Sequence, residues 1–301
     1  MAEPIGLIER AAALLGDHEP NEPAPPLRPA PSLKAAGARV LCPGGPELVL
    51  DRVRLAGFGI SVPSSARSRT VEEFRLIKRN LMTALSQRNP VMDSRSSRLI
   101  IVTSARPGEG KTFVALNLAL AFASERNVTA LLVDVDTQHP GLPRILGVPR
   151  KNGIVDVLAG TLELADVLIQ TDIPNLMILP AGQGGPHVPE LLASREMSAL
   201  LATLAERLPD RFIIIDTPPC MASSDAAALA PLVGQIVFVV EADNTQQGEI
   251  EAALPTLNAC PNISLLLNKS DTLATEHFGS YGYEYHSGGD GGDELRSAEP
   301  E

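Results

Sequence analysis

The chain contains no tryptophan and only three tyrosines, and all three tyrosines stand within five residues of one another near the C-terminus. Tyr281, Tyr283 and Tyr285 occur in the glycine-rich stretch FGSYGYEYHSGG, residues 278–289. A buried phenol supplies apolar contact and a hydrogen-bonding group to a core. The surrounding glycines leave this backbone too free to hold three phenols in such a core. The tyrosine cluster therefore needs an explanation other than packing.

Other shortages exclude whole classes of protein. The three cysteines, Cys42, Cys220 and Cys260, are odd in number and widely spaced, which fits neither a disulfide framework nor a zinc site and favours a reducing compartment. No apolar run is long enough to span a membrane, and Met1 is not followed by a signal segment. A formal net charge of −11 argues against binding to nucleic-acid phosphates. The sequence predicts a soluble, cytoplasmic protein.

Composition divides the chain into three parts. The first contains a short amphipathic helix (residues 6–15) and a proline-rich linker (residues 19–32), and we expect it to be partly disordered. Residues 33–65 have no clear pattern. The last part is rich in glycine and acid and is expected to be a flexible tail. The predicted domains are residues 1–65, the folded domain of residues 66–277, and the tail of residues 278–301.

From Arg98 onward, apolar strands alternate with helices. Continuous Ile, Val and Leu runs of this kind predict a mostly parallel central sheet with helices on both faces, an α/β fold. The expected strands are residues 98–104, 128–136, 175–182, 211–219, 234–243 and 263–271, and the expected helices are residues 70–85, 111–124 and 190–208.

The segment ARPGEGKT, residues 105–112, joins the first of these strands to a helix. It matches the phosphate-binding P-loop pattern G-x-x-x-x-G-K-[ST], except that Ala105 replaces the first glycine. In that pattern backbone amides surround the phosphates, the lysine reaches the β and γ oxygens, and the hydroxyl binds Mg²⁺. The expected nucleotide-binding residues are Ala105, Arg106, Pro107, Gly108, Glu109, Gly110, Lys111, Thr112 and Phe113.

Three aspartates directly follow apolar strands. Asp134 and Asp136 end LLVDVD, and Asp216 ends IIID. Because ligands of open parallel sheets bind beyond the carboxyl ends of the strands, these carboxylates are expected around the phosphate loop. Mg²⁺ takes only one or two protein carboxylates, which leaves one aspartate as a base.

These motifs together with the tyrosine cluster resemble the bacterial tyrosine kinases of exopolysaccharide and capsule production, whose P-loop tolerates alanine at its first position. The segments VEEFRLIKRNL, TSARPGEGKTF, LLASREMSALL and VVEADNTQQG look most like the exosortase-associated tyrosine autokinases. The resemblance covers roughly residues 65–285. It implies a P-loop NTPase fold of the MinD-like (SIMIBI) class and an ATP-dependent protein-tyrosine autokinase that regulates exopolysaccharide synthesis or export.

The same resemblance implies residue roles. Lys111 and Asp134 would be catalytic, with Asp134 deprotonating the acceptor phenol. Thr112, Asp136 and Asp216 would hold Mg²⁺, directly or through water, with ATP as the nucleotide and Asn268 near the adenine. The phosphate acceptors would be Tyr281, Tyr283 and Tyr285, modified by a neighbouring subunit.

This reading explains the tail, because an acceptor that must reach another subunit's active site belongs on a flexible tether. Each phosphate would add up to about −2 to an already acidic segment and favour disassembly.

Two partners follow from the resemblance. In the family a helix with the pattern E-x-x-R-x-x-R packs subunits into a ring; here it reads Glu72, Arg75, Lys78, and lysine lacks the bidentate geometry of arginine. Glu72 and Arg75 also fit an ordinary solvated helix face with i,i+3 pairing. The second partner is an activator, the cytoplasmic end of a membrane-embedded chain-length regulator, which would recruit the chain to the inner face of the membrane. His139 stands where relatives have arginine, and no role is assigned to it.

Three alternatives remain open. A MinD/ParA-like ATPase would carry a signature lysine where this chain has Arg106, and would end in an amphipathic membrane helix. A GTPase would use the NKSD segment, residues 268–271, but the companion D-x-x-G motif is absent. A nucleotide-dependent scaffold would bind ATP without phosphorylating anything, although such pseudo-enzymes usually lose one of the residues Lys111, Asp134, Asp136 and Asp216.

Overall fold

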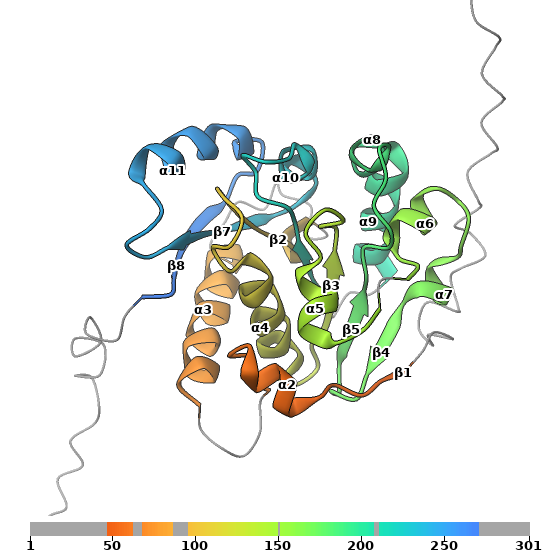
Figure 1. Ribbon diagram of the computed structural model, residues 1–301, viewed down its shortest axis with the longest axis horizontal. Helices are drawn as coiled ribbons and strands as arrows, with labels where there is room; N and C mark the ends of the chain where they lie inside the picture. The colour runs from red at the N-terminus through yellow and green to blue at the C-terminus, as the bar shows by residue number, and fades with distance from the viewer. Residues whose placement is uncertain (1–46, 63–67, 87–95, 150, 208–210, 271–301) are drawn as a thin grey trace, which may run out of the picture. The chain divides into compact units, whose positions relative to one another are not determined.

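The described residues of this computed structural model form one eight-stranded sheet, in the order β1-β4-β5-β3-β6-β2-β7-β8 (Figure 1). The structure describes residues 47–62, 68–86, 96–149, 151–207 and 211–270. The strands are β1 (Glu47–Leu48), β2 (Leu99–Ser104), β3 (Thr129–Asp134), β4 (Ile169–Thr171), β5 (Leu176–Leu179), β6 (Arg211–Asp216), β7 (Gln235–Glu241) and β8 (Ile263–Asn268).

The predicted α/β fold with a mostly parallel sheet is confirmed. All neighbouring strands run parallel except β4 and β5, which are antiparallel. Each of the six strands expected from the sequence is present. The two additional strands, β1 and β4, are two and three residues long, too short for an apolar run to reveal them.

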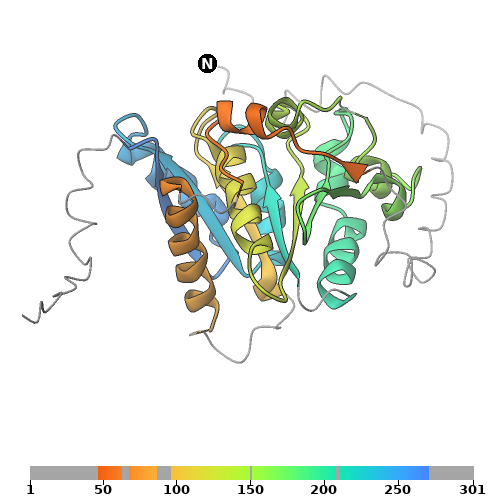
Figure 2. The same cartoon turned by 90° about the horizontal axis from the view of Figure 1, so that it is seen from below.

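Helices cover both faces of the sheet (Figures 1 and 2). Alternate strand residues point to opposite faces, so that Ile101 belongs to one buried cluster and Ile100 to the other. The helices α2 to α5 line one face, and α6 to α11 line the other. Their bounds are α2 (Arg52–Gly57), α3 (Arg69–Ser86), α4 (Lys111–Ala123), α5 (Gly141–Leu146), α6 (Ile154–Leu158), α7 (Leu164–Val167), α8 (Val188–Leu192), α9 (Arg195–Arg207), α10 (Asp225–Leu229) and α11 (Gln247–Ala253), with 3₁₀ turns at Ser96–Arg98, Ala230–Leu232 and Leu254–Leu257.

The single helix expected over residues 190–208 is two helices, α8 and α9. The break falls at Ala193 and Ser194. The Ser194 hydroxyl accepts a hydrogen bond from the Met197 amide at 3.2 Å, as an N-capping residue does. The apolar spacing continues across the break, which is why the pattern alone indicated one helix.

Residues 47–62 pack on the domain, upstream of the boundary expected at residue 66. Strand β1 pairs with β4, and Leu50, Leu55 and Ile60 are buried in the same cluster as α4. The Asp51 carboxylate caps α2 by accepting from the amides of residues 53 and 54. The folded part therefore begins earlier than the sequence pattern indicated, because its first elements are too short to show periodicity.

None of the helices within these described ranges is both long and apolar enough to cross a lipid bilayer. The predicted N-terminal helix, the proline-rich linker and the tail with Tyr281, Tyr283 and Tyr285 lie outside the described residues.

Candidate active site

The carboxyl ends of three adjacent strands, β3, β6 and β2, bring the P-loop and the acidic residues together. Asp134 and Asp216 occupy the same register position on neighbouring strands. The amide of Val135 donates to the Asp216 carbonyl at 2.9 Å, which holds the two chain segments together just past the strands. The P-loop leaves the end of β2, which is the other neighbour of β6. Parallel pairing thus gathers residues that are more than 80 positions apart in the chain.

The P-loop ends in a backbone conformation that requires glycine. Gly110 has φ +97°, and a Cβ built on it would lie 2.1 Å from Asn268 Nδ2. That Asn268 amide donates to the Glu109 carbonyl at 2.8 Å, so β8 holds the loop. Helix α4 starts at the next residue without any side-chain cap. Its first-turn amides are therefore oriented to bind phosphate oxygens.

Ala105, the departure from the P-loop pattern, is fully buried and does not adopt a positive φ. Its methyl group belongs to the core cluster below the sheet edge. Glycine's conformational freedom is not needed at this position, which accounts for the alanine.

Two residues expected to bind nucleotide also hold the loop in shape through their side chains. The Glu109 carboxylate, 1% exposed, accepts from the Arg106 amide at 2.6 Å and from the Thr245 hydroxyl. The Arg106 guanidinium lies 3.2 Å from the Glu249 carboxylate and donates to the Asn244 carbonyl at 3.2 Å. The segment before α11 therefore clamps the P-loop, a role that no sequence motif revealed.

Two further residues expected to bind nucleotide are Pro107 in the loop and Phe113 in the first turn of α4. Pro107 is exposed, and Phe113 is partly buried. The Phe113 ring packs edge-on against Phe74 of α3, with ring centroids 5.9 Å apart. The structure therefore uses the Phe113 side chain to join α3 to α4.

Lys111 lies at the centre of the acidic residues. Its ammonium nitrogen is 2.9 Å from Asp136 Oδ2, and its side chain is 9% exposed. Asp136 Oδ1 accepts from the His139 amide at 2.8 Å, and Asp134 Oδ1 accepts from the Asp136 amide at 2.9 Å. Asp134 Oδ2 is buried and has no hydrogen-bond partner among the described residues.

The two register-matched carboxyls hold protons more tightly than ordinary aspartates. Burial raises the pKa of Asp134 well above its usual value, and the neighbouring Asp216 charge raises it further. Burial raises the pKa of Asp216 to about 7, although the Lys111 ammonium and the Thr112 hydroxyl act in the opposite direction. A raised pKa makes the ionised Asp134 carboxylate a stronger base than an ordinary aspartate, as general base catalysis requires.

Thr112, Asp136 and Asp216 fit a magnesium ion. Hydroxyl and carboxylate oxygens are the ligands that Mg²⁺ prefers, and buried Asp216 lacks a full set of hydrogen bonds. Within the described ranges no group of three or more His, Cys, Asp or Glu side chains forms a metal site by itself. Mg²⁺ usually takes one or two protein carboxylates and keeps several waters, so Asp136 and Asp216 with the Thr112 hydroxyl are the residues that would hold it.

Sequence reasoning missed two residues next to this site. Gly141 begins α5 against Thr112; a Cβ there would lie 2.6 Å from the Thr112 hydroxyl oxygen. Asp225, 3% exposed, lies close enough to Asp136 for the Asp136 charge to raise its pKa, although burial is the larger cause. An aspartate that opens a helix is common, so its sequence position carried no signal.

The residues expected at the oligomer interface lie on α3. Arg75 pairs with Glu72 within the helix, and both are about half exposed. Lys78 is buried and pairs with Glu125, which follows α4 in the same chain. Glu72 and Arg75 remain accessible to another molecule, whereas Lys78 is engaged inside its own domain.

Comparison with known proteins identifies the domain. A family model described as "AAA domain" matches residues 97–259, more than half of the chain. The chain belongs to this AAA domain family. The matched range contains the P-loop and all three strand-end aspartates, so the AAA domain and the candidate active site coincide.

Named relatives of this AAA domain are tyrosine kinases. Tyrosine-protein kinase wzc of Salmonella typhimurium is 31% identical over 221 residues, which are 72% of this chain and 29% of that protein. Tyrosine-protein kinase CpsD of Streptococcus agalactiae is 28% identical over 220 residues, 71% of this chain and 89% of that protein. The chain thus spans less than a third of the Salmonella protein.

Solved structures agree. The chimerical protein CapA2B2 is 27% identical and superposes with a TM-score of 0.61, covering 80% of this chain and 100% of that one. The VpsO kinase domain is 31% identical with a TM-score of 0.52, covering 66% of this chain and 98% of that one. The resemblance to bacterial tyrosine kinases, and the P-loop NTPase fold that it implied, are confirmed; the exosortase-associated subgroup stays a prediction.

Proposed function

We propose that this chain is an ATP-dependent protein-tyrosine kinase that phosphorylates Tyr281, Tyr283 and Tyr285 of a neighbouring copy. The observation that carries the proposal is Asp134, whose buried Oδ2 has no partner among the described residues and whose carboxyl lies beside the Lys111–Asp136 pair. The three tyrosines also favour a kinase over a simple ATPase, because an enzyme that transfers phosphate only to water needs no acceptor phenols. The kinase names of the relatives support the same assignment.

The chemistry needs positioning and charge neutralisation. The amides at the start of α4 and the Lys111 ammonium would hold the ATP phosphates, which compete with Asp136 for that ammonium. Asp134 takes the proton of the acceptor phenol. The phenol oxygen then forms a bond to the γ-phosphorus as the bond from that phosphorus to the β–γ bridging oxygen breaks. The products are phosphotyrosine and ADP, and Asp134 releases its proton to solvent.

Thr112, Asp136 and Asp216 would hold Mg²⁺, whose charge stabilises the transferring phosphoryl group. Asn268, tied to the P-loop through the Glu109 carbonyl, is proposed to lie beside the adenine.

The proposed setting is the inner face of the membrane. There a membrane-embedded polysaccharide chain-length regulator would activate the chain, and copies would assemble through Glu72 and Arg75 of α3. The kinase would in this way regulate exopolysaccharide synthesis or export.

The test is a mass-spectrometric map of phosphate on purified chain incubated with Mg²⁺ and either ATP or GTP. Phosphate on the three tyrosines from ATP, absent in Asp134→Asn and Lys111→Met, is the expected result. Thermal unfolding of both variants checks that they fold. A blank map is followed by the same assay with the membrane regulator present.

Other outcomes identify the rival functions. Steady ATP hydrolysis with unmodified tyrosines would favour a MinD/ParA-like ATPase, and transfer from GTP alone would favour a guanine-nucleotide enzyme. A Lys111→Met chain that still binds its partner and leaves polysaccharide output unchanged would favour a scaffold.

A further inference from the structure

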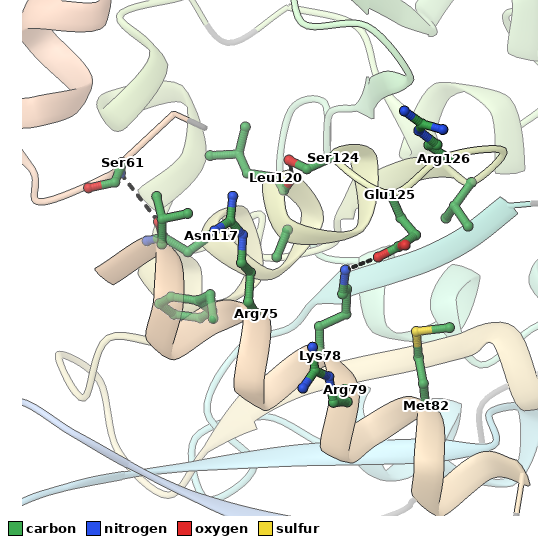
Figure 3. Close-up of a pocket in the computed structure, with 14 residues that line it drawn as sticks. Ser61, Arg75, Lys78, Arg79, Met82, Asn117, Leu120, Ser124, Glu125 and Arg126 are labelled. Carbon is green, nitrogen blue, oxygen red and sulfur yellow. Dashed lines mark hydrogen bonds and ion pairs between the residues drawn. The ribbon is translucent and has the colours of Figure 1, made fainter. Parts of the chain in front are cut away.

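A cavity of about 530 Å³ lies between α3 and the C-terminal half of α4 (Figure 3). Its volume is in the range of pockets that bind small molecules or side chains. The α4 part of its wall begins at Asn117 and continues past the end of the helix, whereas the phosphate-binding amides lie at the start of α4. The candidate active site does not use this cavity.

The cavity is positively charged in an acidic protein. Four basic side chains and one acidic side chain line the cavity: Arg75, Lys78, Arg79, Arg126 and Glu125. Their formal charges sum to +3, whereas the whole chain has −11. Lys78 and Glu125 neutralise each other by their ion pair, and Arg75 pairs with Glu72. Arg79 and Arg126, both exposed, form no ion pair with any residue that the structure describes.

The rest of the wall is mostly apolar, with Ser61, Asn117 and Ser124 as its polar members. Met82 from α3 and Leu120 from α4 line the cavity (Figure 3), as does Phe74 from α3. An apolar wall with arginines at its rim suits an aromatic ring that carries an anion. Phosphotyrosine has this combination, and the arginine guanidinium binds phosphate with two parallel hydrogen bonds.

The chain itself supplies such a ligand. Residues 271–301 contain eight acidic residues against one arginine, a formal charge of −7, and all three tyrosines. Each phosphate adds about −1.5 to −2 at neutral pH. Tyr281 follows Ser270, the last described residue, by eleven positions, and eleven extended residues span up to about 40 Å.

We propose that the cavity between α3 and α4 binds the phosphorylated tyrosines of this chain's own C-terminal tail. Arg79 and Arg126, which lie on opposite sides of the Lys78–Glu125 pair (Figure 3), each take the phosphate of one phosphotyrosine, and the apolar part of the wall takes the rings. Arg75 belongs both to this cavity and to the proposed subunit interface. Docking of the tail would therefore compete with assembly, so that phosphorylation favours separated chains. The proposal rests on the proposed kinase function only for the origin of the phosphate.

The test measures binding of a synthetic fluorescent peptide of residues 278–289 with phosphate on its tyrosines. Full-length Lys111→Met chain is the receptor, because an inactive chain leaves its own tail unmodified and the cavity open. The expected result is at least tenfold weaker binding after Arg79→Glu with Arg126→Glu. The control is Arg195→Glu, an exposed arginine at the start of α9 on the opposite face of the sheet, which keeps the affinity.

Three results would overturn the proposal. These are equal binding by the double variant, equal binding of the unphosphorylated peptide, and loss of vesicle binding in the double variant without any phosphopeptide binding. The last uses vesicles with anionic lipid and would assign the cavity to a membrane surface. Because synthesis supplies the phosphate, a chain without kinase activity still gives a clear answer.

Discussion

The carboxyl groups of Asp134 and Asp216 lie side by side on neighbouring strands and have almost no access to water. Their raised pKa values mean that the folded chain binds protons which the unfolded chain releases near pH 4. The stability that these groups contribute is present at low pH. It is lost as the pH rises through the folded-state values.

Asp216→Asn is therefore expected to stabilise the chain increasingly as the pH rises. Below about pH 4 the carboxyl is protonated in both the folded and the unfolded chain, and it then differs least from the amide. Between the unfolded-state pKa near 4 and the folded-state pKa of about 7, stability falls as the pH rises, because only the folded chain keeps the proton. Since one pKa unit is worth about 1.4 kcal/mol, the gain in unfolding free energy of the variant should increase by at most about 3 kcal/mol from pH 5 to pH 8. Denaturant unfolding at pH 5 and pH 8, without nucleotide or Mg²⁺, measures this increase.

The matched control is Asp243→Asn, because Asp243 is exposed. Its effect should be the same at both pH values. A pH-independent difference between wild type and Asp216→Asn would contradict the account of the buried pair.

Gly110 and Ala105 allow the P-loop backbone to be tested one atom at a time. Gly110→Ala adds a methyl group at φ +97° against Asn268, so nucleotide affinity should fall at least tenfold and stability by about 1–3 kcal/mol. Ala105→Gly removes a buried methyl from an ordinary conformation, so affinity should stay while stability falls by about 1–2 kcal/mol. Calorimetric titration with ATP, combined with thermal unfolding, distinguishes the two. An equal affinity loss in Ala105→Gly would contradict this account, because it would show that the buried alanine methyl matters for nucleotide binding as much as the Gly110 backbone does.

Among the elements, the ones missed from the sequence are the short ones. Strands such as β2 and β6 consist of continuous apolar residues and were found. Strand β1 has two residues and α2 six, which is shorter than the windows over which a strand or helix period can be recognised. Strand β1 is stabilised by pairing with β4, and α2 by the burial of Leu55 in the core. Both are contacts between distant parts of the chain, so the local sequence does not indicate them.

Removal of residues 1–65 is expected to destabilise the domain far more than removal of residues 1–46. The longer deletion takes away Leu50, Leu55 and Ile60, which are all buried, and a single buried leucine replaced by alanine already costs about 2–5 kcal/mol. Thermal unfolding of both truncated chains measures the difference. Equal melting temperatures would mean that residues 47–62 do not belong to the cooperative unit.

The ion pair of Lys78 and Glu125 joins α3 to the end of α4. The two side chains should contribute unequally to the free energy of unfolding. Glu125 is about half exposed, so Glu125→Gln should change stability by less than about 1 kcal/mol. Lys78→Ala also removes a buried aliphatic stem and should cost about 1–2 kcal/mol. Urea unfolding measures both, and a larger effect of Glu125→Gln would reverse this division.

At the scale of the whole molecule, the site was predictable where it depends on topology. Parallel strands end at one edge, so Asp134, Asp136 and Asp216 were expected together although they come from two separate runs of sequence. The clamp of Glu109 by Thr245 depends instead on the path of a loop, and Asp225 depends on where α10 is placed. Loop paths follow from the assembled fold, so no local pattern predicted either residue.

Phosphorylation between molecules has its own test. A mixture of Asp134→Asn chain, with its tyrosines intact, and active chain with all three tail tyrosines changed to phenylalanine should place phosphate on the Asp134→Asn chain. The physical reason is that donor site and acceptor tail then reside on different molecules. Mass spectrometry of the isotopically labelled Asp134→Asn chain measures it. An unmodified chain in the mixture, alongside a self-modified wild type, would show transfer within one molecule.

Because of the buried acidic pair, the rate at which proteases degrade the chain should depend on the concentration of its ligands. A nucleotide bound together with a cation, whose positive charge offsets the repulsion between Asp134 and Asp216, stabilises only the folded state, by about 2.7 kcal/mol at a hundredfold excess over its dissociation constant. Proteases that attack the unfolded form would then remove the ligand-free chain first. The abundance of this protein would follow the nucleotide supply of the cell, even without a change in its synthesis.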